Sequence, residues 1–521
     1  MWNSIADKIF SFYLKERWNS LMQDQNDPVN AQERAYGRLR AKLAGTHIFR
    51  ITNLETAFDY REFTETALER TYDDFKLMVD LTLESNCRNV LFRGRPSYVG
   101  LSSGTTGHNS KKIIFNKGME KAFESYQLSV ATILKQCADY SFLSEDRLTW
   151  GSSPLVEKTD TGVPCGYVSG FLATHAHPLS KSRSLPSLEI TSIEDMDEKI
   201  RRAGAQARNT DLHLISGVPS YIVHFLEELR KMWGIENFHA IWPNLKVIVY
   251  SGTGIDSYRH QLQALLGHPI QFIGCYISTE GPFGYEIPAL NGGESGVYSF
   301  HYGDLVYTFR HSGDSEHAQK HFLTVGDLKE GDEVELFITS PNGLVNYRTG
   351  DCLKIRSTAP LLFEIIGRVG HGVNVAAEKV TLSQLNKAAA RLNQENSLGL
   401  RHFFVLPGQS ASSKPCYEWI LLADRPGALD PEIIQEFLDQ ALMELNSDYR
   451  ENRLDFGFLD VPTIQVLSSE LASQYFEKAS HRGQLKMKVA FDSREKFQAF
   501  LNDLELDATV LNQGWAVAEA V

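Results

Sequence analysis

The chain lacks paired cysteines, long apolar runs and an excess of positive charge. Its 521 residues include only six cysteines, and none of these has the spacing of a metal ligand. A chain of this length buries enough apolar surface to fold without disulfides, so we expect free thiols in a reducing compartment. No apolar segment reaches the roughly 20 residues that a membrane-spanning helix requires. Disulfide-rich secreted domains and helical membrane proteins are therefore disfavoured.

The scarcity of positive charge excludes further classes of protein. Lysine and arginine total 52 against 65 aspartates and glutamates, which gives a formal net charge of −13. A protein that binds nucleic acid or an anionic membrane would show a basic face. Residues 1–10 place charges within an apolar run, which indicates an amphipathic helix and not a secretory signal. We expect a cytoplasmic protein without nucleic-acid or membrane partners.

The chain changes its secondary-structure pattern along its length. Residues 1–90 are mostly helical, because apolar residues recur at helical spacing in Ile5–Met22 and Phe63–Leu83. Between about 98 and 280, apolar strands alternate with amphipathic helices. This alternation predicts a largely parallel sheet with helices on its faces.

From residue 297 the pattern changes to short strands with little helix between them, which predicts a small antiparallel sheet or barrel. Residues 356–370 have the composition of a domain boundary, and a compact α+β segment follows. The predicted fold is α/β. A large N-terminal domain, residues 1–366, combines α/β sheets with a small β-barrel-like subdomain, and residues 367–521 form a smaller, mobile α+β domain.

A glycine-rich stretch, Tyr98–Phe115, carries the first sign of chemistry. Its centre holds serine and threonine hydroxyls around Gly104 and Gly107, followed by Lys111 and Lys112. Backbone N–H groups, hydroxyls and a lysine together suit a phosphate. The spacing is not that of a P-loop, and a strand follows where a P-loop has a helix. The alternative is a polar hairpin turn.

Two strand ends are further candidates, because ligands of parallel sheets bind beyond the carboxyl ends of the strands. Ser251-Gly252-Thr253-Gly254 is a turn where backbone can approach a flat ligand, or an ordinary strand-to-helix turn. In Tyr276–Glu280, Tyr276 can stack on a purine, Thr279 can donate to a phosphate and Glu280 can hold Mg²⁺. The alternative for this stretch is a helix N-cap with an acidic first turn.

Two later features complete the candidates. Asp351 follows a predicted strand, where it can accept hydrogen bonds from a ribose diol or cap a turn. The run His481–Lys488 is basic in an acidic protein, and its alternative interpretation is a solvated surface.

These segments together resemble the adenylate-forming enzymes. Within that superfamily the chain is most similar to the plant auxin-responsive acyl acid–amido synthetases, the Gretchen Hagen 3 family. The matching segments, in chain order, are Ser102–Thr106 with Lys111, Tyr276–Gly284, Gly343–Asp351, Leu445–Arg453 and Gly483–Lys486. The pattern departs from the family at several positions: His108, Asn109, Val345, Asn346, Asn446 and Leu485.

The resemblance implies roles for individual residues toward ATP and Mg²⁺. The phosphates would be held by Ser102, Ser103, Thr105, Thr106 and Lys111, with Thr106 also catalytic. Tyr276 would flank the adenine and Thr279 the α-phosphate, and Asp351 would hold the ribose. Glu280 would hold the metal and be catalytic. The turn Ser251, Gly252 and Thr253 would line the nucleotide. Arg368 would lie near the interdomain hinge, and catalytic Lys486 would reach the acyl-phosphate oxygens from the small domain.

The resemblance also implies a reaction. A carboxylate attacks the α-phosphate of ATP, and an amine such as an amino acid then displaces AMP to give an amide. One alternative is an acyl-CoA or carrier-protein ligase with the same first step. Another is a non-catalytic nucleotide-binding relic, which is disfavoured because Lys111, Glu280, Asp351 and Lys486 are all present.

Overall fold

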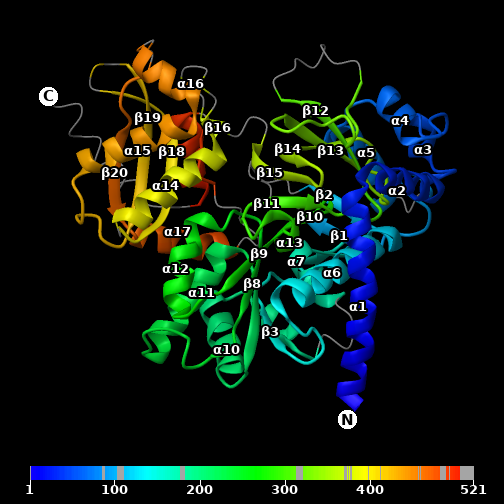
Figure 1. The fold of residues 1–521 in the computed structure, drawn as a ribbon, viewed down its shortest axis with the longest axis horizontal. Helices are drawn as coiled ribbons and strands as arrows, with labels where there is room; N and C mark the ends of the chain where they lie inside the picture. The colour runs from blue at the N-terminus through cyan, green and yellow to red at the C-terminus, as the bar shows by residue number, and fades with distance from the viewer. Residues whose placement is uncertain are drawn as a thin grey trace. The chain divides into compact units, whose positions relative to one another are not determined.

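Figure 1 shows a computed structural model of the chain. The structure describes residues 2–84, 88–101, 111–175, 182–312, 321–368, 372–373, 375, 378, 380–396, 398–410, 412, 414–455, 457, 459–481, 488–491 and 493–504. Contacts divide the chain into two compact units. The first comprises residues 1–255 and 261–365, and the second comprises 256–260 and 366–521. None of the described helices is long and apolar enough to cross a membrane.

The described helices up to residue 300 alternate with strands or pack around them. They are α1 (Trp2–Asn26), α2 (Pro28–Leu43), α3 (His47–Ile51), α4 (Tyr60–Thr66), α5 (Tyr72–Glu84), α6 (Lys117–Ala138), α7 (Val168–Thr174), α9 (Leu188–Thr191), α10 (Met196–Arg208), α11 (Pro219–Trp233), α12 (Asp256–Leu266) and α13 (Pro288–Asn291). Several of these helices have an N-cap side chain that accepts a hydrogen bond from the first turn. Asn116 accepts a hydrogen bond from the Met119 N–H, for example, and so satisfies a donor that the first turn of α6 leaves free.

An eleven-stranded sheet carries most of the first unit. In spatial order it contains β12 (Val306–His311), β13 (Glu333–Thr339), β14 (Tyr347–Thr358), β15 (Leu361–Arg368), β11 (Val297–Phe300), β10 (Gly281–Tyr285), β9 (Gln271–Ser278), β8 (Val247–Ser251), β7 (Leu212–Gly217), β3 (Asp146–Thr149) and β6 (Ser184–Leu185). The strands β6, β3, β7, β8 and β9 run parallel, as the alternating pattern predicts.

The antiparallel strands after residue 280 are confirmed, but they do not form a separate sheet. The chain reverses at the β9–β10 hairpin. Next to β9 in the sheet lies β10, followed by β11 and then β15, and each of these neighbours pairs antiparallel. The parallel and antiparallel halves are therefore one continuous sheet. A smaller four-stranded sheet orders β2 (Lys112–Phe115), β1 (Tyr98–Leu101), β5 (Pro164–Gly166) and β4 (Glu157–Lys158).

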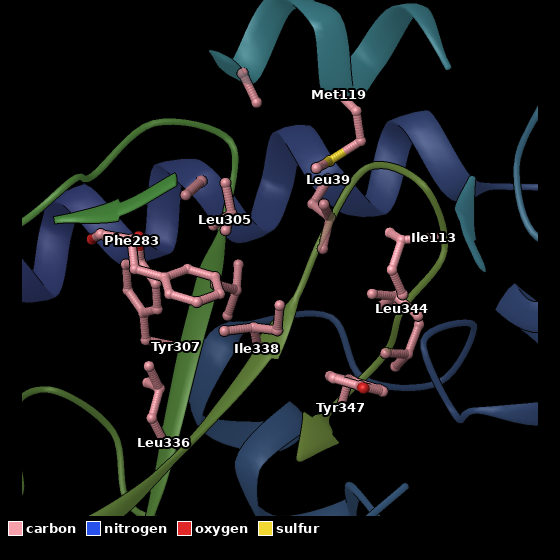
Figure 2. Packing of buried hydrophobic residues seen from close by; sticks show 14 of the residues in the cluster. Leu39, Ile113, Met119, Phe283, Leu305, Tyr307, Leu336, Ile338, Leu344 and Tyr347 are labelled. Carbon is pink, nitrogen blue, oxygen red and sulfur yellow. The ribbon is translucent and has the colours of Figure 1, made fainter. Parts of the chain in front are cut away.

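The main core of the first unit joins both sheets to the N-terminal helices. Figure 2 shows part of it, with residues from far-apart segments: Leu39, Ile113, Met119, Phe283, Leu305, Tyr307, Leu336, Ile338, Leu344 and Tyr347. Tyr347 is 1% exposed although its strand also carries a candidate site residue. The core therefore reaches the back of the candidate site.

The helical spacing over Phe63–Leu83 predicts one helix, but the structure has two, α4 and α5. The segment between them lies along β14, where Arg70 forms a parallel bridge with Tyr347. The Arg70 N–H donates to the Asn346 carbonyl, and the Arg348 N–H donates to the Arg70 carbonyl. These backbone hydrogen bonds to a distant strand interrupt the helix. The spacing of apolar residues could not predict this, because it contains no information about distant strands.

The second unit is the predicted α+β segment. Its elements are β16 (Gly372–Val373), β17 (Val380–Thr381), α14 (Leu382–Asn396), β18 (Leu400–Gln409), β19 (Pro415–Ala423), α15 (Pro431–Leu445), α16 (Ser447–Arg450), the π-helix Glu451–Asp455, β20 (Thr463–Ser468), α17 (Glu470–His481) and α18 (Arg494–Asp503). Phe403 and Val405 of β18 pack with α14 and α15, whereas Phe404 and Leu406 pack with α17 and α18. Side chains alternate between the two faces of a strand, and both faces of β18 are covered here, so the run Phe403–Leu406 is apolar without interruption.

The family-like stretch Leu445–Arg453 is part of this core. The Tyr449 hydroxyl donates to Asp439 at 2.7 Å, and Arg453 donates to both oxygens of the same carboxylate. Asn446 donates to the Glu378 carbonyl at 3.1 Å and accepts from the Tyr449 N–H at 2.8 Å. An amide makes both contacts, so asparagine suits this position better than an aspartate, which has no donor.

Candidate functional site: a nucleotide site in the first unit

The glycine-rich stretch joins two antiparallel strands, as the sequence predicts. β1 and β2 pair with Leu101 opposite Lys112, so the connecting loop begins and ends at one place. Gly100 lies against the β9–β10 turn, because a Cβ at Gly100 would be 2.5 Å from Cγ2 of Thr279. Only glycine permits this approach. The start of the loop is thereby placed beside Thr279.

Five predicted site residues lie outside the described part of the chain. They are Ser102, Ser103, Thr105 and Thr106 of the loop, and Lys486 of the basic run. Their roles stay predictions. The other predicted residues are Lys111, Ser251, Gly252, Thr253, Tyr276, Thr279, Glu280, Asp351 and Arg368, and the structure describes all of them.

Thr279 and Glu280 form the turn of a tight hairpin. Ser278 of β9 pairs with Gly281 of β10, which leaves these two residues at the tip. The alternative of a helix N-cap at this position is wrong. The Ser278 hydroxyl donates to Glu280 Oε2 at 3.0 Å and accepts from the Glu280 N–H at 3.1 Å. The serine thus fixes both the backbone and the carboxylate of Glu280.

A tyrosine that the sequence did not single out links two candidate charges. The Tyr347 hydroxyl lies 3.4 Å from Glu280 Oε1 and 3.4 Å from the Lys111 Nζ. The Lys111 ammonium also lies 5.9 Å from the centre of the Tyr347 ring. Lys111 and Glu280 are 169 positions apart in the chain, yet one phenol bridges them. Sequence patterns could not identify Tyr347, since a buried aromatic residue on a strand is typical of a core.

Tyr276 and Asp351 meet directly, although four strand intervals separate β9 from β14 in the sheet. The Tyr276 hydroxyl donates to Asp351 Oδ2 at 2.5 Å. In a flat sheet the two strands would be about 19 Å apart, at about 4.8 Å per interval. The sheet must therefore curl between them, which agrees with the predicted barrel-like subdomain. This curl joins the two halves of the candidate site.

The turn after β8 lies next to Tyr276. Ser251 pairs with Cys275, the residue before Tyr276, across the parallel β8–β9 ladder. Gly252 has φ of +84°, a conformation that favours glycine. The Thr253 Oγ1 is buried and has no hydrogen-bond partner among the described residues. A buried hydroxyl without a partner is uncommon, and it is consistent with a ligand at this turn.

The remaining residue, Arg368, is the last residue of β15 and belongs to the second unit. The first unit therefore brings Lys111, Thr279 and Glu280 together at the loop. It also brings Ser251, Tyr276 and Asp351 together along the strand ends.

The carboxylate of Glu280 suits a hard cation. Its hydrogen-bond partners among the described residues are the neutral hydroxyls of Ser278 and Tyr347, and it forms no ion pair with a lysine or arginine of that part of the chain. Within the same residues, no three His, Cys, Asp or Glu side chains gather as a metal cage. Mg²⁺ is commonly held by one or two carboxylates together with substrate phosphates, so a single glutamate beside a phosphate loop fits this ion.

A buried lysine lies at the carboxyl end of β3 and was not predicted. Lys199 of α10 is 6% exposed, and its ammonium donates to the Gly151 carbonyl at 2.8 Å. It lies 5.3 Å from the centre of the Trp150 ring. Burial lowers the pKa of Lys199 to about 8. Lys199 therefore loses its proton at a lower pH in the folded state than in the unfolded chain.

Replacement of Lys199 by methionine should change the pH dependence of stability. In the unfolded chain the lysine loses its proton near pH 10.4, so between pH 8 and 10.4 the unfolded state binds more protons and stability rises with pH. The free energy of unfolding of Lys199→Met, minus that of the native chain, should therefore fall by about 3 kcal/mol from pH 7 to pH 10.5. Denaturant unfolding at both pH values measures this difference. Lys121→Met, at an exposed position, is the control. If the difference in free energy of unfolding between Lys199→Met and the native chain does not change with pH, the lowered pKa of Lys199 is contradicted.

Comparisons with known proteins identify the fold. A solved GH3.15 acyl acid amido synthetase in complex with 2,4-DB aligns with a TM-score of 0.75 and 17% identity, covering 93% of this chain and 95% of that one. A 2-hydroxyisobutyryl-CoA ligase in a postadenylation state aligns with a TM-score of 0.58 and 12% identity, covering 90% and 91%. The fold is that of the adenylate-forming enzymes.

Family models identify the chain more narrowly. Residues 17–233 match the GH3 family N-terminal domain, 298–368 the central domain and 383–495 the C-terminal domain. The chain belongs to the GH3 family, as the sequence resemblance predicts. An indole-3-acetic acid-amido synthetase of Arabidopsis thaliana, GH3.4, is 26% identical over 260 residues, 47% of this chain and 43% of that protein. The matched stretches span less than half the length of the first curated relatives.

Proposed function

We propose that the protein is an ATP-dependent acyl acid–amido synthetase. It activates a carboxylic acid as an acyl-adenylate and transfers the acyl group to an amine such as an amino acid. The observation that carries this proposal is the convergence of Lys111, Glu280, Tyr276 and Asp351 in one unit. Membership of the GH3 family supports it, because the relatives include an indole-3-acetic acid-amido synthetase.

In the first step, a carboxylate oxygen of the acid attacks the α-phosphorus of ATP, and pyrophosphate leaves. Negative charge spreads over the phosphate oxygens in the transition state, where preorganised donors and cations are most effective. Lys111 and the loop hydroxyls, including catalytic Thr106, neutralise and orient the phosphates, with Thr279 beside the α-phosphate. Glu280 would hold Mg²⁺, which would supply further positive charge. Catalytic Lys486 adds an ammonium at the acyl-phosphate oxygens.

The nucleoside is held by the other half of the site. Asp351 accepts from the ribose hydroxyls and Tyr276 lies against the adenine. Ser251, Gly252 and Thr253 line the purine, and the Thr253 Oγ1 gains a partner there. The hydrogen bond between Tyr276 and Asp351 at 2.5 Å orients both side chains before ATP arrives. Binding to a preorganised site costs less conformational entropy.

In the second step, the amine nitrogen attacks the acyl carbon, AMP leaves and the nitrogen loses a proton. We assign residues 1–366 to the adenylation domain and 367–521 to a mobile lid that carries Lys486, with Arg368 at the hinge. Domain closure of this kind is common among enzymes that exclude water from a reactive intermediate. The five cysteines described are free, which favours a cytoplasmic location.

The acceptor distinguishes this function from its main alternative, an acyl-CoA or carrier-protein ligase with the same first step. The fold of a CoA ligase is similar at a TM-score of 0.58, so fold alone does not separate the two. Incubation with ATP, Mg²⁺, a panel of carboxylic acids and hydroxylamine should yield hydroxamates. Replacing hydroxylamine by amino acids should give amides. Thioester with coenzyme A, and no amide, would overturn the acceptor assignment.

The bridging phenol gives a smaller, specific prediction. Tyr347→Phe removes the hydroxyl between Lys111 and Glu280 but leaves the ring in the core. We expect the KM for ATP to rise about five- to tenfold, the effect of losing one hydrogen-bond partner of a charged group. Steady-state kinetics measures it. Tyr307→Phe is the matched control, because its hydroxyl donates to the carbonyls of Phe283 and His301, and it should lower stability without changing KM.

A further inference from the structure

Asn346 is the last residue of the turn between β13 and β14, and its backbone conformation is unusual for a buried residue. Its φ is +47°, a left-handed conformation that non-glycine residues seldom adopt. Three other non-glycine residues of the described chain have a positive φ, namely Asn53, Asn89 and Asp139, and all three are exposed. Asn346 is 0% exposed. Such a conformation persists in a core only where its surroundings hold it, and it is commonest at functional sites.

Each polar atom of Asn346 has a partner on another segment. The side-chain oxygen accepts from the Thr308 hydroxyl of β12 at 2.5 Å, and the side-chain amide donates to the Leu68 carbonyl at 3.1 Å. The backbone N–H donates to the Thr339 hydroxyl at 2.9 Å, and the backbone carbonyl accepts from the Arg70 N–H at 3.2 Å. Strand β12, the end of β13 and the segment between α4 and α5 therefore fix this one residue.

The same turn also contacts the strand that follows the glycine loop. The Asn342 side chain, which is 2% exposed, donates to the Ile114 carbonyl of β2 at 3.0 Å. Strand β2 begins one residue after Lys111, and β14 begins with Tyr347. The turn therefore joins the two strands whose first residues lie at or beside the partners of the phenol bridge.

Tyr347 (Figure 2) follows Asn346 directly, so the position of its hydroxyl depends on where β14 begins. That hydroxyl lies 3.4 Å from both the Lys111 Nζ and Glu280 Oε1. Both distances are at the long end for a hydrogen bond, so a small displacement of the phenol would break the two contacts. The bridge therefore requires a fixed start of the strand.

We propose that Asn346 is a positioning residue of the nucleotide site, which places the Tyr347 hydroxyl between Lys111 and Glu280. This inference rests on the proposed function, because the bridge orients these two charges for the phosphates of ATP and for Mg²⁺. Asparagine suits the position, since it adopts a left-handed φ more readily than most residues and its amide offers both a donor and an acceptor. Asn346 is also one of the positions where the sequence departs from its family.

Replacement of Asn346 by glycine tests this role, because glycine accepts the left-handed φ and removes only the side-chain hydrogen bonds. The full chain is labelled with fluorotyrosine, and the fluorine NMR resonance that is absent from Tyr347→Phe is assigned to Tyr347. This resonance should shift in Asn346→Gly without any ligand. Asn53→Gly is the matched control, because Asn53 has a φ of +61° and its amide donates to the Thr66 carbonyl at 3.3 Å. It should leave the resonance in place.

Isothermal titration with ATP in the presence of Mg²⁺ measures the consequence for binding. The Kd should rise about five- to tenfold in Asn346→Gly, as for Tyr347→Phe, because both changes remove the same hydroxyl from the bridge. The double variant should bind ATP no more weakly than Tyr347→Phe alone, since both changes act through one group. A purely structural role of Asn346 would instead give effects on the Kd that multiply.

Thr308→Val provides a second variant that decides the question if Asn346→Gly does not fold. It removes the hydroxyl from which Asn346 accepts, and it should shift the Tyr347 resonance in the same direction by less. The proposal is overturned if neither variant shifts this resonance, if Asn53→Gly shifts it equally, or if the effects on the Kd multiply in the double variant. If the native chain binds no ATP, the proposed function fails, while the resonance still decides whether Asn346 positions Tyr347.

Discussion

Replacing Glu280 by glutamine lowers the rate of acyl-adenylate formation by at least about a hundredfold, which is the scale of losing one preorganised electrostatic stabiliser. Glutamine keeps the shape of the side chain and can still contact Ser278 and Tyr347. It removes the negative charge that a magnesium ion requires. The expected loss is therefore in turnover and in the apparent affinity for Mg²⁺, while the fold is retained.

Initial rates of hydroxamate formation at several Mg²⁺ concentrations measure this effect. Glu364→Gln is the matched control, because Glu364 is a carboxylate of the same sheet that pairs with Arg356 at 2.7 Å. It should change stability slightly and the rate little. A near-normal rate for Glu280→Gln at low Mg²⁺ would remove Glu280 from the site.

Replacing Lys486 by alanine should have an effect of similar size. An ammonium that reaches the acyl-phosphate oxygens stabilises charge that develops only in the transition state, so its loss lowers turnover by at least about a hundredfold. The KM for ATP should change much less, because the ground-state phosphates keep Lys111 and the loop. Single-turnover adenylation with saturating ATP measures the rate.

Lys488→Ala provides the comparison, since this lysine is two positions further along the chain. Its ammonium lies 4.4 Å from the centre of the Phe491 ring, within the second unit. Lys488→Ala should lower the free energy of unfolding by about 0.5–1 kcal/mol, the value of such a cation–π contact. It should leave the rate of adenylation within about threefold of the native rate. Equal losses in both variants would show that the basic run acts through its overall charge and not through Lys486.

Local patterns in the sequence were sufficient where the structure is local. The two strands on either side of the glycine loop follow from their apolar residues. The order of the strands after residue 280 does not follow, because β11 pairs with β15 and not with β12, the next strand in the chain. The same patterns could not reveal that these strands continue the parallel sheet, since this depends on the hairpin at Thr279 and Glu280.

The parts of the site that could not be predicted depend on long-range packing. Tyr276 meets Asp351 only because the sheet curls, and curvature is a property of many strands together. The buried position of Lys199 and the bridging role of Tyr347 also depend on packing between distant segments. A lysine on an amphipathic helix and a tyrosine on a strand have ordinary interpretations, and only the fold shows what surrounds them.

The central claim is that the chain activates a carboxylate with ATP. Carboxylate-dependent exchange of labelled pyrophosphate into ATP measures this step alone, before any amine is involved. With a panel of aryl, indolyl and aliphatic acids, we predict that at least one acid supports exchange that requires Mg²⁺ and is lost in Glu280→Gln. If the folded protein binds ATP but no acid of the panel supports exchange, the account of this protein as an acyl-adenylate synthetase is contradicted.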